Sequence, residues 1–105
     1  MKFSLSSNDI TQLLKKSKPI YTKNFHIRAI PSNALKTGFS IKKRCGSAVL
    51  RNRFKRQLRV LVTSFANQYS PLKILIMTDK NIYKISNPKK EIGDVFHALC
   101  RDTLL

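Results

Sequence analysis

The amino-acid sequence predicts an α+β fold, a small α/β sandwich in which three helices pack on a mixed sheet of about four strands. Three observations predict it. Apolar residues recur at steps of three and four in three segments, which is typical of helices. Between the first and second of these segments, apolar and polar residues alternate, as in half-buried strands. After the second segment there is one short, continuous apolar run, as in a buried strand. The predicted order is helix, two or three strands, helix, strand and helix, in a single domain covering residues 1–105.

The first helix is expected from about Ser7 to Lys16. Residues 6–8 are all helix-capping types, and the lysines at its end suit the negative pole of the helix dipole before Pro19 stops it. Its apolar stripe is narrow and consists of Ile10, Leu13 and Leu14. Such a helix needs a sheet to lie against.

Two alternating segments follow and predict strands. In Ile20–Ile30 the residues Phe25, Ile27 and Ala29 share one side, and Thr37–Lys43 resumes the alternation after a turn at residues 31–34. Two such segments joined by a short turn predict an antiparallel hairpin with one apolar face. Its other face is typical of surfaces on which an extended single strand of RNA lies, and it offers His26, Arg28, Ser40 and Lys42.

The central helix is expected from about Gly46 to Gln68 and has two different sides. The apolar stripe comprises Leu50, Phe54, Leu58, Leu61, Val62 and Phe65. The polar side carries Arg51, Asn52, Arg53, Lys55, Arg56 and Arg59. Lys55 lies four residues from both Arg51 and Arg59, a spacing at which like charges repel.

Charge favours a nucleic-acid face over a merely solvated one. The formal net charge is +16, and between Asp9 and Asp79 there are fifteen Lys or Arg residues and no acid. Such a cluster favours binding to the fixed phosphates of a nucleic acid, because binding releases the counterions of those phosphates. An acidic membrane surface is the second class of anionic partner, and an amphipathic membrane-surface helix explains the charge but neither Asn52 nor the globular pattern around the helix.

The last two elements are a strand and a helix. Residues 73–78 are continuously apolar between their ends, as in a strand buried on both faces. Asn87 and Pro88 open a helix as cap and first residue, and its stripe is Ile92, Val95, Phe96 and Leu99. If the strands on either side of the central helix are parallel neighbours, the general rule predicts a right-handed crossover.

Catalytic and metal-binding patterns are absent from the sequence. The five carboxylates are scattered, and Cys45 and Cys100 are expected to be two reduced thiols because neither has a partner at metal spacing. No signal peptide or membrane span is recognisable, so a soluble, cytoplasmic binding protein is expected.

The central helix carries a motif that resembles the protein subunit of bacterial ribonuclease P. That family's signature is a basic pair, then Gly, Ala-Val, Arg-Asn-Arg, Lys-Arg and Arg at fixed spacing. Every defined position is filled here, by Lys43-Arg44, Gly46, Ala48-Val49, Arg51-Asn52-Arg53, Lys55-Arg56 and Arg59. Length and element order fit over nearly the whole chain, although outside residues 38–59 the likeness is one of pattern.

The resemblance implies a left-handed crossover through the central helix, in contrast to the general rule. It implies as partners a catalytic RNA subunit and precursor tRNA, whose 5′ leader is removed by hydrolysis, with no membrane and no further protein required. Magnesium is then held by the RNA, and the protein alone binds no cofactor. The residues implied to meet the RNA subunit are Lys43, Arg44, Arg51, Asn52, Arg53, Lys55, Arg56 and Arg59.

The family's leader cleft often carries aromatic residues where this chain has Ile10, Leu14 and Arg28. Leader contact is therefore expected from phosphate charge and from Phe25, if it is accessible rather than part of the strand core. The full expected set is Phe25, His26, Arg28, Ser40 and Lys42. A ribosomal-type or general RNA-binding protein with no processing role is the alternative function.

Overall fold

The computed structural model describes residues 5–67 and 72–101, without the side chains of residues 100 and 101. In the described parts the chain forms three α-helices, four strands and two short 3₁₀ turns. Their bounds in chain order are α1 Ser7–Lys16, β1 Ile20–Tyr21, β2 His26–Pro31, β3 Lys36–Ile41, η1 Lys43–Cys45, α2 Ala48–Ala66, β4 Leu72–Thr78, η2 Ile82–Lys84 and α3 Pro88–Arg101.

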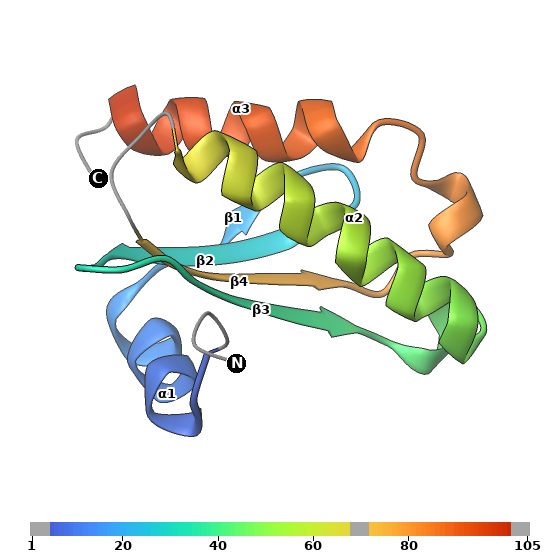
Figure 1. The fold of residues 1–105 in the computed structure, drawn as a ribbon, viewed down its shortest axis with the longest axis horizontal. Helices are drawn as coiled ribbons and strands as arrows, with labels where there is room; N and C mark the ends of the chain where they lie inside the picture. Colours follow the sequence, from blue (N-terminus) through green and yellow to red (C-terminus); the bar gives the residue numbers. More distant parts are fainter. Residues whose placement is uncertain (1–4, 68–71, 102–105) are drawn as a thin grey trace.

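The elements form three layers. The sheet lies in the middle, α2 and α3 cover one of its faces, and α1 lies against part of the other (Figure 1). The strand order is β1-β2-β4-β3, with β4 antiparallel to β2 and parallel to β3. The α+β class, the mixed four-stranded sheet and the three helices are therefore confirmed.

The predicted pairing of β2 with β3 is wrong, because β4 lies between them. β4 is the most deeply buried strand, and its apolar side chains point to both faces: Ile74 and Ile76 are fully buried towards α2 and α3, and Leu75 is nearly buried on the other side. A strand of this composition is stabilised by neighbours on both edges and helices on both faces. The link between β2 and β3 therefore crosses the position of β4, which lies about 4.8 Å from each of them.

The segment predicted as one strand, Ile20–Ile30, is instead two strands joined by a tight turn. The amide of Thr22 donates to the carbonyl of Phe25 at 2.9 Å, and the amide of Phe25 donates back to Thr22 Oγ1 at 3.0 Å. Asn24, a residue type that favours turns, lies between them. The chain thus folds back after Tyr21, which pairs directly with His26.

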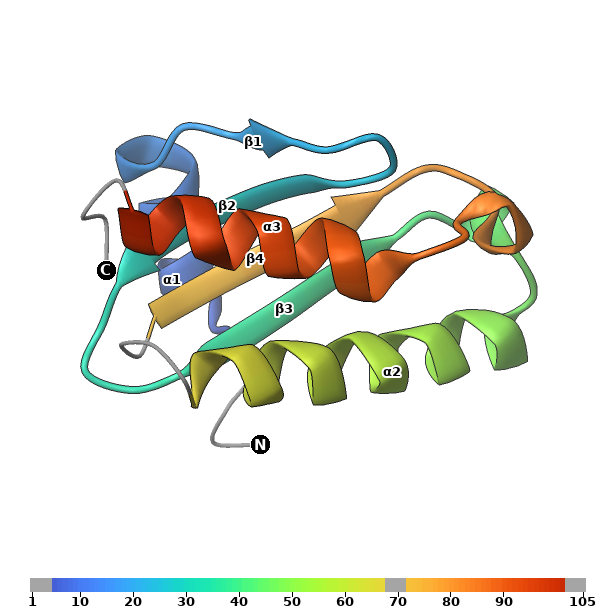
Figure 2. The ribbon, with the colours of Figure 1, turned by 90° about the horizontal axis from the view of Figure 1, so that it is seen from above.

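The connection from β3 through α2 to β4 is a left-handed crossover. Figure 2 views the sheet from the side of α2 and α3, with β3 and β4 running in the same direction and β4 on the left of β3 when both are followed from start to end. A right-handed connection through a helix on the viewer's side would place the second strand on the right. The expectation from the family resemblance is confirmed, and the general rule fails here.

The main core lies between the sheet and the pair α2 and α3. The predicted stripes supply it, with Phe54, Leu58 and Val62 from α2 buried against the stripe of α3. The rings of Phe65 and Phe96 stack across the two helices with centroids 5.6 Å apart. Gly93 permits this approach, because a Cβ atom at that position would lie 2.9 Å from Cζ of Phe65. In the described part of the chain, no helix is long and apolar enough to span a bilayer.

Candidate RNA interface

Helix α2 presents one face to the core and the other to the surroundings. It begins at a capped end, where Ser47 Oγ accepts a hydrogen bond from the amide of Leu50 at 3.1 Å. Because Phe54 and Leu58 are buried, the residues half a turn away must point outward. The sequence pattern alone thus determines which side of α2 is available to a partner.

The outward side carries the predicted basic residues. Asn52, Arg53, Arg56 and Arg59 are exposed, whereas Arg51 and Lys55 are half-buried at its borders. Arg51 Nε donates to the carbonyl of Gly46 at 3.2 Å, which leaves the terminal nitrogens of its guanidinium free of that bond. The guanidinium of Arg59 lies over the ring of Phe39 on β3, 5.8 Å from its centroid, so it is oriented by a cation–π contact.

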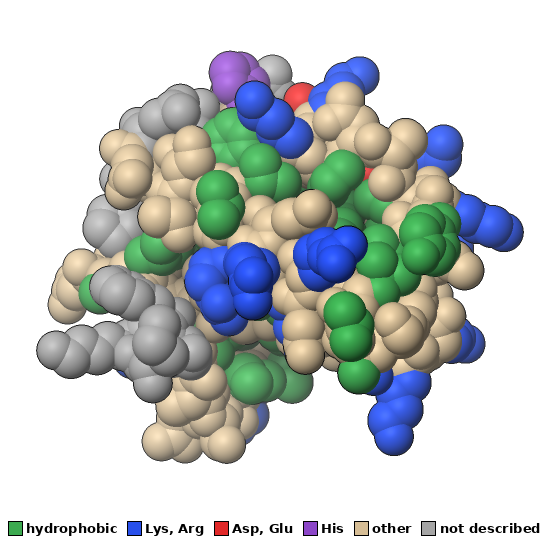
Figure 3. Space-filling model, turned by 45° about the vertical axis from the view of Figure 1, so that its right-hand side comes forward, with side chains coloured by type: hydrophobic (Ala, Val, Ile, Leu, Met, Phe, Trp, Pro, Cys, Tyr) green, Lys and Arg blue, Asp and Glu red, His purple; other side chains and the backbone are tan. Residues whose placement is uncertain are grey.

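Among the described residues, no ion pair joins an acid to a basic residue of α2. Asp9 pairs with Lys36 and Lys73, and Asp79 pairs with Arg44. Figure 3 shows a face on which Lys and Arg side chains recur while acidic ones are barely visible. The basic side of α2 therefore keeps its full positive potential for an external anion.

The basic pair before α2 lies in η1 and differs in its two members. Lys43 is exposed, whereas Arg44 Nη2 lies 2.7 Å from Asp79 Oδ2, just after β4. Both partners of this pair are largely exposed, so a phosphate can compete for Arg44. Cys45 is buried as a free thiol whose Sγ lies 3.6 Å from the carbonyl oxygen of Thr78. The side chain of Cys100 lies outside the described residues.

The face of the sheet towards α1 contains a second candidate surface. α1 lies beneath the end of the sheet where β3 and β4 begin, and the described residues place no helix under the end where these strands finish (Figure 1). At that end one row of cross-strand neighbours spans all four strands. We call it the open row, and its members are Tyr21, His26, Met77 and Ser40.

The open row borders a pocket of about 230 Å³. Three of the residues predicted to contact a leader, His26, Ser40 and Lys42, line it together. The remaining lining residues are Met77, Thr78 and Asp79. The predicted residues therefore meet at one place, although β2 and β3 are not neighbours.

Phe25 does not belong to this surface. It is fully buried on the opposite face of the sheet, and its ring stacks on that of Phe54 with centroids 6.2 Å apart. The condition for its contact with a leader, that it be accessible, is therefore not met, and the alternative of a place in the strand core is confirmed. The alternation of Phe25 and Ile27 reflects the core between β2 and α2.

Arg28 lies on the face of α1, but its guanidinium binds the end of that helix. Arg28 Nη1 donates to the carbonyl of Ser17 at 2.7 Å and to that of Leu14 at 3.4 Å. A cation at a helix C-terminus satisfies free carbonyls and interacts favourably with the dipole. The structure therefore gives Arg28 a role in fixing α1; it does not line the pocket, and its contact with a leader stays a prediction.

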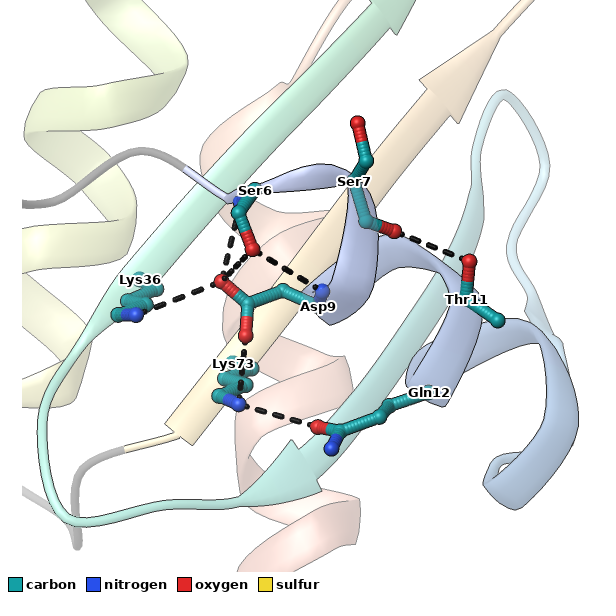
Figure 4. A network of polar contacts seen from close by, with 7 residues as sticks. All are labelled: Ser6, Ser7, Asp9, Thr11, Gln12, Lys36 and Lys73. Carbon is teal, nitrogen blue, oxygen red and sulfur yellow. Dashed lines mark hydrogen bonds and ion pairs between the residues drawn. The ribbon is translucent and has the colours of Figure 1, made fainter.

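Asp9 fixes the other end of α1 to the sheet (Figure 4). It forms a capping box with Ser6, whose amide donates to Asp9 Oδ2 at 3.0 Å while Ser6 Oγ accepts from the amide of Asp9 at 3.2 Å. Lys73 Nζ lies 2.6 Å from Asp9 Oδ1, and Lys36 Nζ lies 3.4 Å from Oδ2. The Lys73 ammonium, followed by the Ser6 amide, holds the pKa of Asp9 well below its usual value.

Glu91 has a structural role that the sequence did not indicate. Its carboxylate accepts hydrogen bonds from Thr22 Oγ1 at 2.7 Å and from the amide and side chain of Asn24 at 2.9 and 2.7 Å. Burial opposes its ionisation, but these hydrogen bonds outweigh burial and hold the pKa of Glu91 below its usual value. The bonds tie the turn between β1 and β2 to α3 and so fix the position of Tyr21.

The carboxylates of the described residues do not form a metal site. Asp9, Asp79 and Glu91 each bind protein donors in different parts of the fold. No three His, Cys, Asp or Glu side chains among residues 5–67 and 72–99 gather in a group that could hold a metal ion.

Sequence reasoning missed Tyr21 and Met77 in the open row. Tyr21 was assigned to one long strand, in which it would share the apolar side with Phe25. The residue types of the turn, Thr22 to Asn24, were the available signal that the chain reverses there. Met77 was assigned only to a buried strand.

Comparison with known proteins gives a consistent result. A family model described as Ribonuclease P matches residues 4–100. A ribonuclease P protein component from Finegoldia magna is 32% identical over 92 residues, which cover 87% of this chain and 74% of that protein. One from Acholeplasma laidlawii is 35% identical over 68 residues, covering 63% and 59% of the two chains.

Solved structures show the same fold. The RNase P protein of Staphylococcus aureus aligns with a TM-score of 0.73 at 19% identity, over 97% of this chain and 96% of that one. The RNase P protein of Thermotoga maritima aligns with a TM-score of 0.67 at 15% identity, over 90% and 96%.

Proposed function

This chain belongs to the ribonuclease P protein family, and from that membership we propose that α2 binds the RNA subunit while the pocket at the open row holds the 5′ leader of precursor tRNA. As a member, the chain is a protein component of an endoribonuclease that acts in tRNA 5′ processing. The partners and the contact surfaces are the proposal. Two separate surfaces allow both RNAs to be bound at once.

The unpaired basic side of α2 is the observation that carries this proposal. Arg53, Arg56 and Arg59 project from one rigid helix, and no acid of the described residues neutralises them. A helix that accepts such repulsion gains most when a polyanion with fixed phosphate positions lies against it. Arginine forks also bind phosphate with two parallel hydrogen bonds, which fixes orientation as well as charge.

The leader surface is supported by the chemistry of the pocket. Lys42 supplies positive charge, Ser40 and His26 supply hydrogen-bonding groups, and no helix of the described residues covers this face of the sheet at this end. A surface of this kind suits single-stranded RNA, whose phosphates and base edges are all exposed. It lies on the opposite side of the sheet from α2, so leader and RNA subunit do not compete.

The protein's own part in the reaction is to bind and orient RNA. With no carboxylate cluster among the described residues, we assign the hydrolysis to the RNA subunit, which supplies the magnesium chemistry when assembled. The proposed complex consists of this chain, the RNA subunit and precursor tRNA. It is cytoplasmic and requires neither a membrane nor another protein.

Reconstitution tests the proposal. The purified chain, added to a bacterial ribonuclease P RNA at low magnesium concentration, should restore cleavage of precursor tRNA, because its positive charge replaces magnesium in screening phosphates. The chain should also bind that RNA more tightly than an unrelated structured RNA of equal length. Equal affinities would favour a general RNA-binding protein and contradict the proposal.

The leader surface has its own test. Lys42→Ala should weaken binding of leader-bearing precursor by the assembled complex and leave binding of tRNA without a leader unchanged. Lys89→Ala is the matched control, because Lys89 is also an exposed lysine but lies in the first turn of α3, on the other side of the sheet. Equal effects of the two variants would remove the pocket from the proposal.

A further inference from the structure

Tyr21 lies at one end of the open row with its ring outside the core. It is 65% exposed, although aromatic side chains of this size are usually more buried. Its ring meets that of His26 edge to face, with centroids 4.6 Å apart and an interplanar angle of 80°. The two rings therefore form a corner whose outer surface is free to receive a flat, apolar group.

The position of this corner is fixed by strand pairing and by the turn that follows Tyr21. Tyr21 pairs with His26 in the sheet, and the turn that follows Tyr21 is held to α3 by the hydrogen bonds of Thr22 and Asn24 to Glu91. A second acid, Asp94, lines the same pocket as Thr22, Asn24 and Glu91, but its side chain is exposed. A ring held in this way loses little conformational freedom when a ligand stacks on it.

The open row has the dimensions of a short single strand. From Tyr21 on β1 to Ser40 on β3 it crosses three strand spacings, or about 14 Å. Tyr21 is at one end, and the pocket extends from His26, the other ring of the corner, to Ser40 and Lys42 at the other end. An extended RNA crossing the strands can thus place a base at Tyr21 while a phosphate of another nucleotide lies near Lys42.

We propose that Tyr21 stacks on one unpaired base of the leader and so determines which leader nucleotide is held at the edge of the sheet. This inference rests on the proposed function, since it takes the open row as the leader surface. His26 acts as a positioning residue that holds the Tyr21 ring upright. The contact favours no base by hydrogen bonding, because every base has a face that can stack.

A double-mutant cycle, in which one change is made in the leader and the other in the protein, tests the stack in the assembled complex. Precursor tRNAs are prepared with a leader of constant length in which a single nucleotide at a time lacks its base. Each is bound to complexes containing the parent chain, Tyr21→Ala, Tyr21→Phe or Tyr83→Ala. Tyr83 is the matched control, because it is a second exposed tyrosine, 84% accessible, and lies on η2, which contacts α2 on the other side of the sheet.

With the intact leader, Tyr21→Ala should weaken binding about five- to 150-fold, the range expected for loss of one base–aromatic stack. Tyr21→Phe keeps the ring and should stay close to the parent, as should Tyr83→Ala. At one leader position, removing the base should lower the affinity of the parent complex as much as Tyr21→Ala does. The two changes together should lower the affinity no more than either alone. Affinity for the RNA subunit should be the same in all four proteins.

The failure of this inference is distinguishable from failure of the proposed function. If the parent complex assembles and prefers leader-bearing substrate, but Tyr21→Ala binds every substrate like Tyr83→Ala, the stack is refuted and the function stands. Strictly additive losses at every leader position would also refute it. If the parent chain does not assemble with the RNA subunit at all, the proposed function itself is refuted.

Discussion

The two faces of the sheet use the same four strands but hold their helices in different ways. On one face α2 and α3 are attached by apolar packing, with Leu58, Ile76 and Phe96 fully buried. On the other face α1 buries a single leucine, Leu13, and polar contacts hold the helix at both ends, through Asp9 at its start and Arg28 at its finish. The apolar face supplies most of the stability, because burial of large side chains is the dominant favourable contribution to folding.

The difference explains how so small a chain keeps a surface for RNA. A helix that is fixed by one buried leucine and a few directed polar contacts can cover part of a sheet face and leave the rest accessible. Purely apolar packing would require the whole face to be covered, since exposed apolar area of that size promotes association. The polar attachment of α1 therefore allows the open row to stay uncovered.

The largest effect is expected on the apolar face. Leu58→Ala should lower the free energy of unfolding by about 2 to 5 kcal/mol, because it removes buried methyl groups and leaves a cavity. Leu14→Ala on α1 is the control, since Leu14 is 52% exposed, and its cost should be about 0.5 kcal/mol or less. Urea denaturation measures both, and equal losses would contradict the comparison of the two faces.

Next comes the outward side of α2, which should affect binding without affecting the fold. Arg53→Ala combined with Arg56→Ala should weaken affinity for the RNA subunit and reduce its logarithmic salt slope by about 0.7 to 0.9 for each lost phosphate contact. The matched control is Lys15→Ala with Lys16→Ala, exposed lysines on the opposite side of the sheet. A slope that is unchanged in the first double variant would mean that α2 faces away from the RNA.

The polar attachment of α1 should depend on pH. Because the pKa of Asp9 is depressed in the folded state, its contribution to stability is fully present above the unfolded-state pKa of about 4 and is lost as the pH falls through the folded value. The stability gap between the parent and Asp9→Asn should therefore be constant at neutral pH and narrow below pH of about 4. Asp79→Asn, which alters an exposed pair, should show a much smaller gap, and a gap for Asp9→Asn that persists in acid would contradict the ionic role.

The smallest effect is expected from Arg28. Arg28→Ala should lower the free energy of unfolding by about 1 kcal/mol, the usual net contribution of a hydrogen bond, and should loosen only the end of α1. Hydrogen exchange should become faster in the last turn of α1 and stay unchanged in α3. If exchange in α1 is unchanged while leader binding falls, the guanidinium contacts the leader and not the helix end.

The helices could be predicted from the sequence almost residue by residue. α1 has the predicted bounds Ser7–Lys16, and Asn87 caps α3 as expected, its Oδ1 accepting from the amide of Lys90 at 3.1 Å. The reason is that periodicity and capping are local properties of the chain. The basic side of α2 was predictable for the same reason. α2 runs from Ala48 to Ala66, within the predicted range of about Gly46 to Gln68, and Gln68 itself lies outside the described residues.

Strand pairing and face assignment could not be predicted in the same way. The position of β4 between β2 and β3 depends on contacts between distant segments, which alternation does not encode. The turn after Tyr21 places an odd number of steps between Tyr21 and His26 and brings both to one face, whereas a continuous strand would separate them. Arg28 was assigned to the open face correctly, but its bond to Ser17 depends on where α1 packs.

The central place of β4 has a consequence for synthesis on the ribosome. The strand that joins the two halves of the sheet is the last to be made, and until residues 72–78 emerge, β2 and β3 have no shared neighbour. A nascent chain that ends before residue 72 carries the complete basic helix but lacks the strand that supports it. We therefore expect native RNA affinity to be acquired late and together with the sheet, so that incomplete chains do not occupy the site of the finished protein.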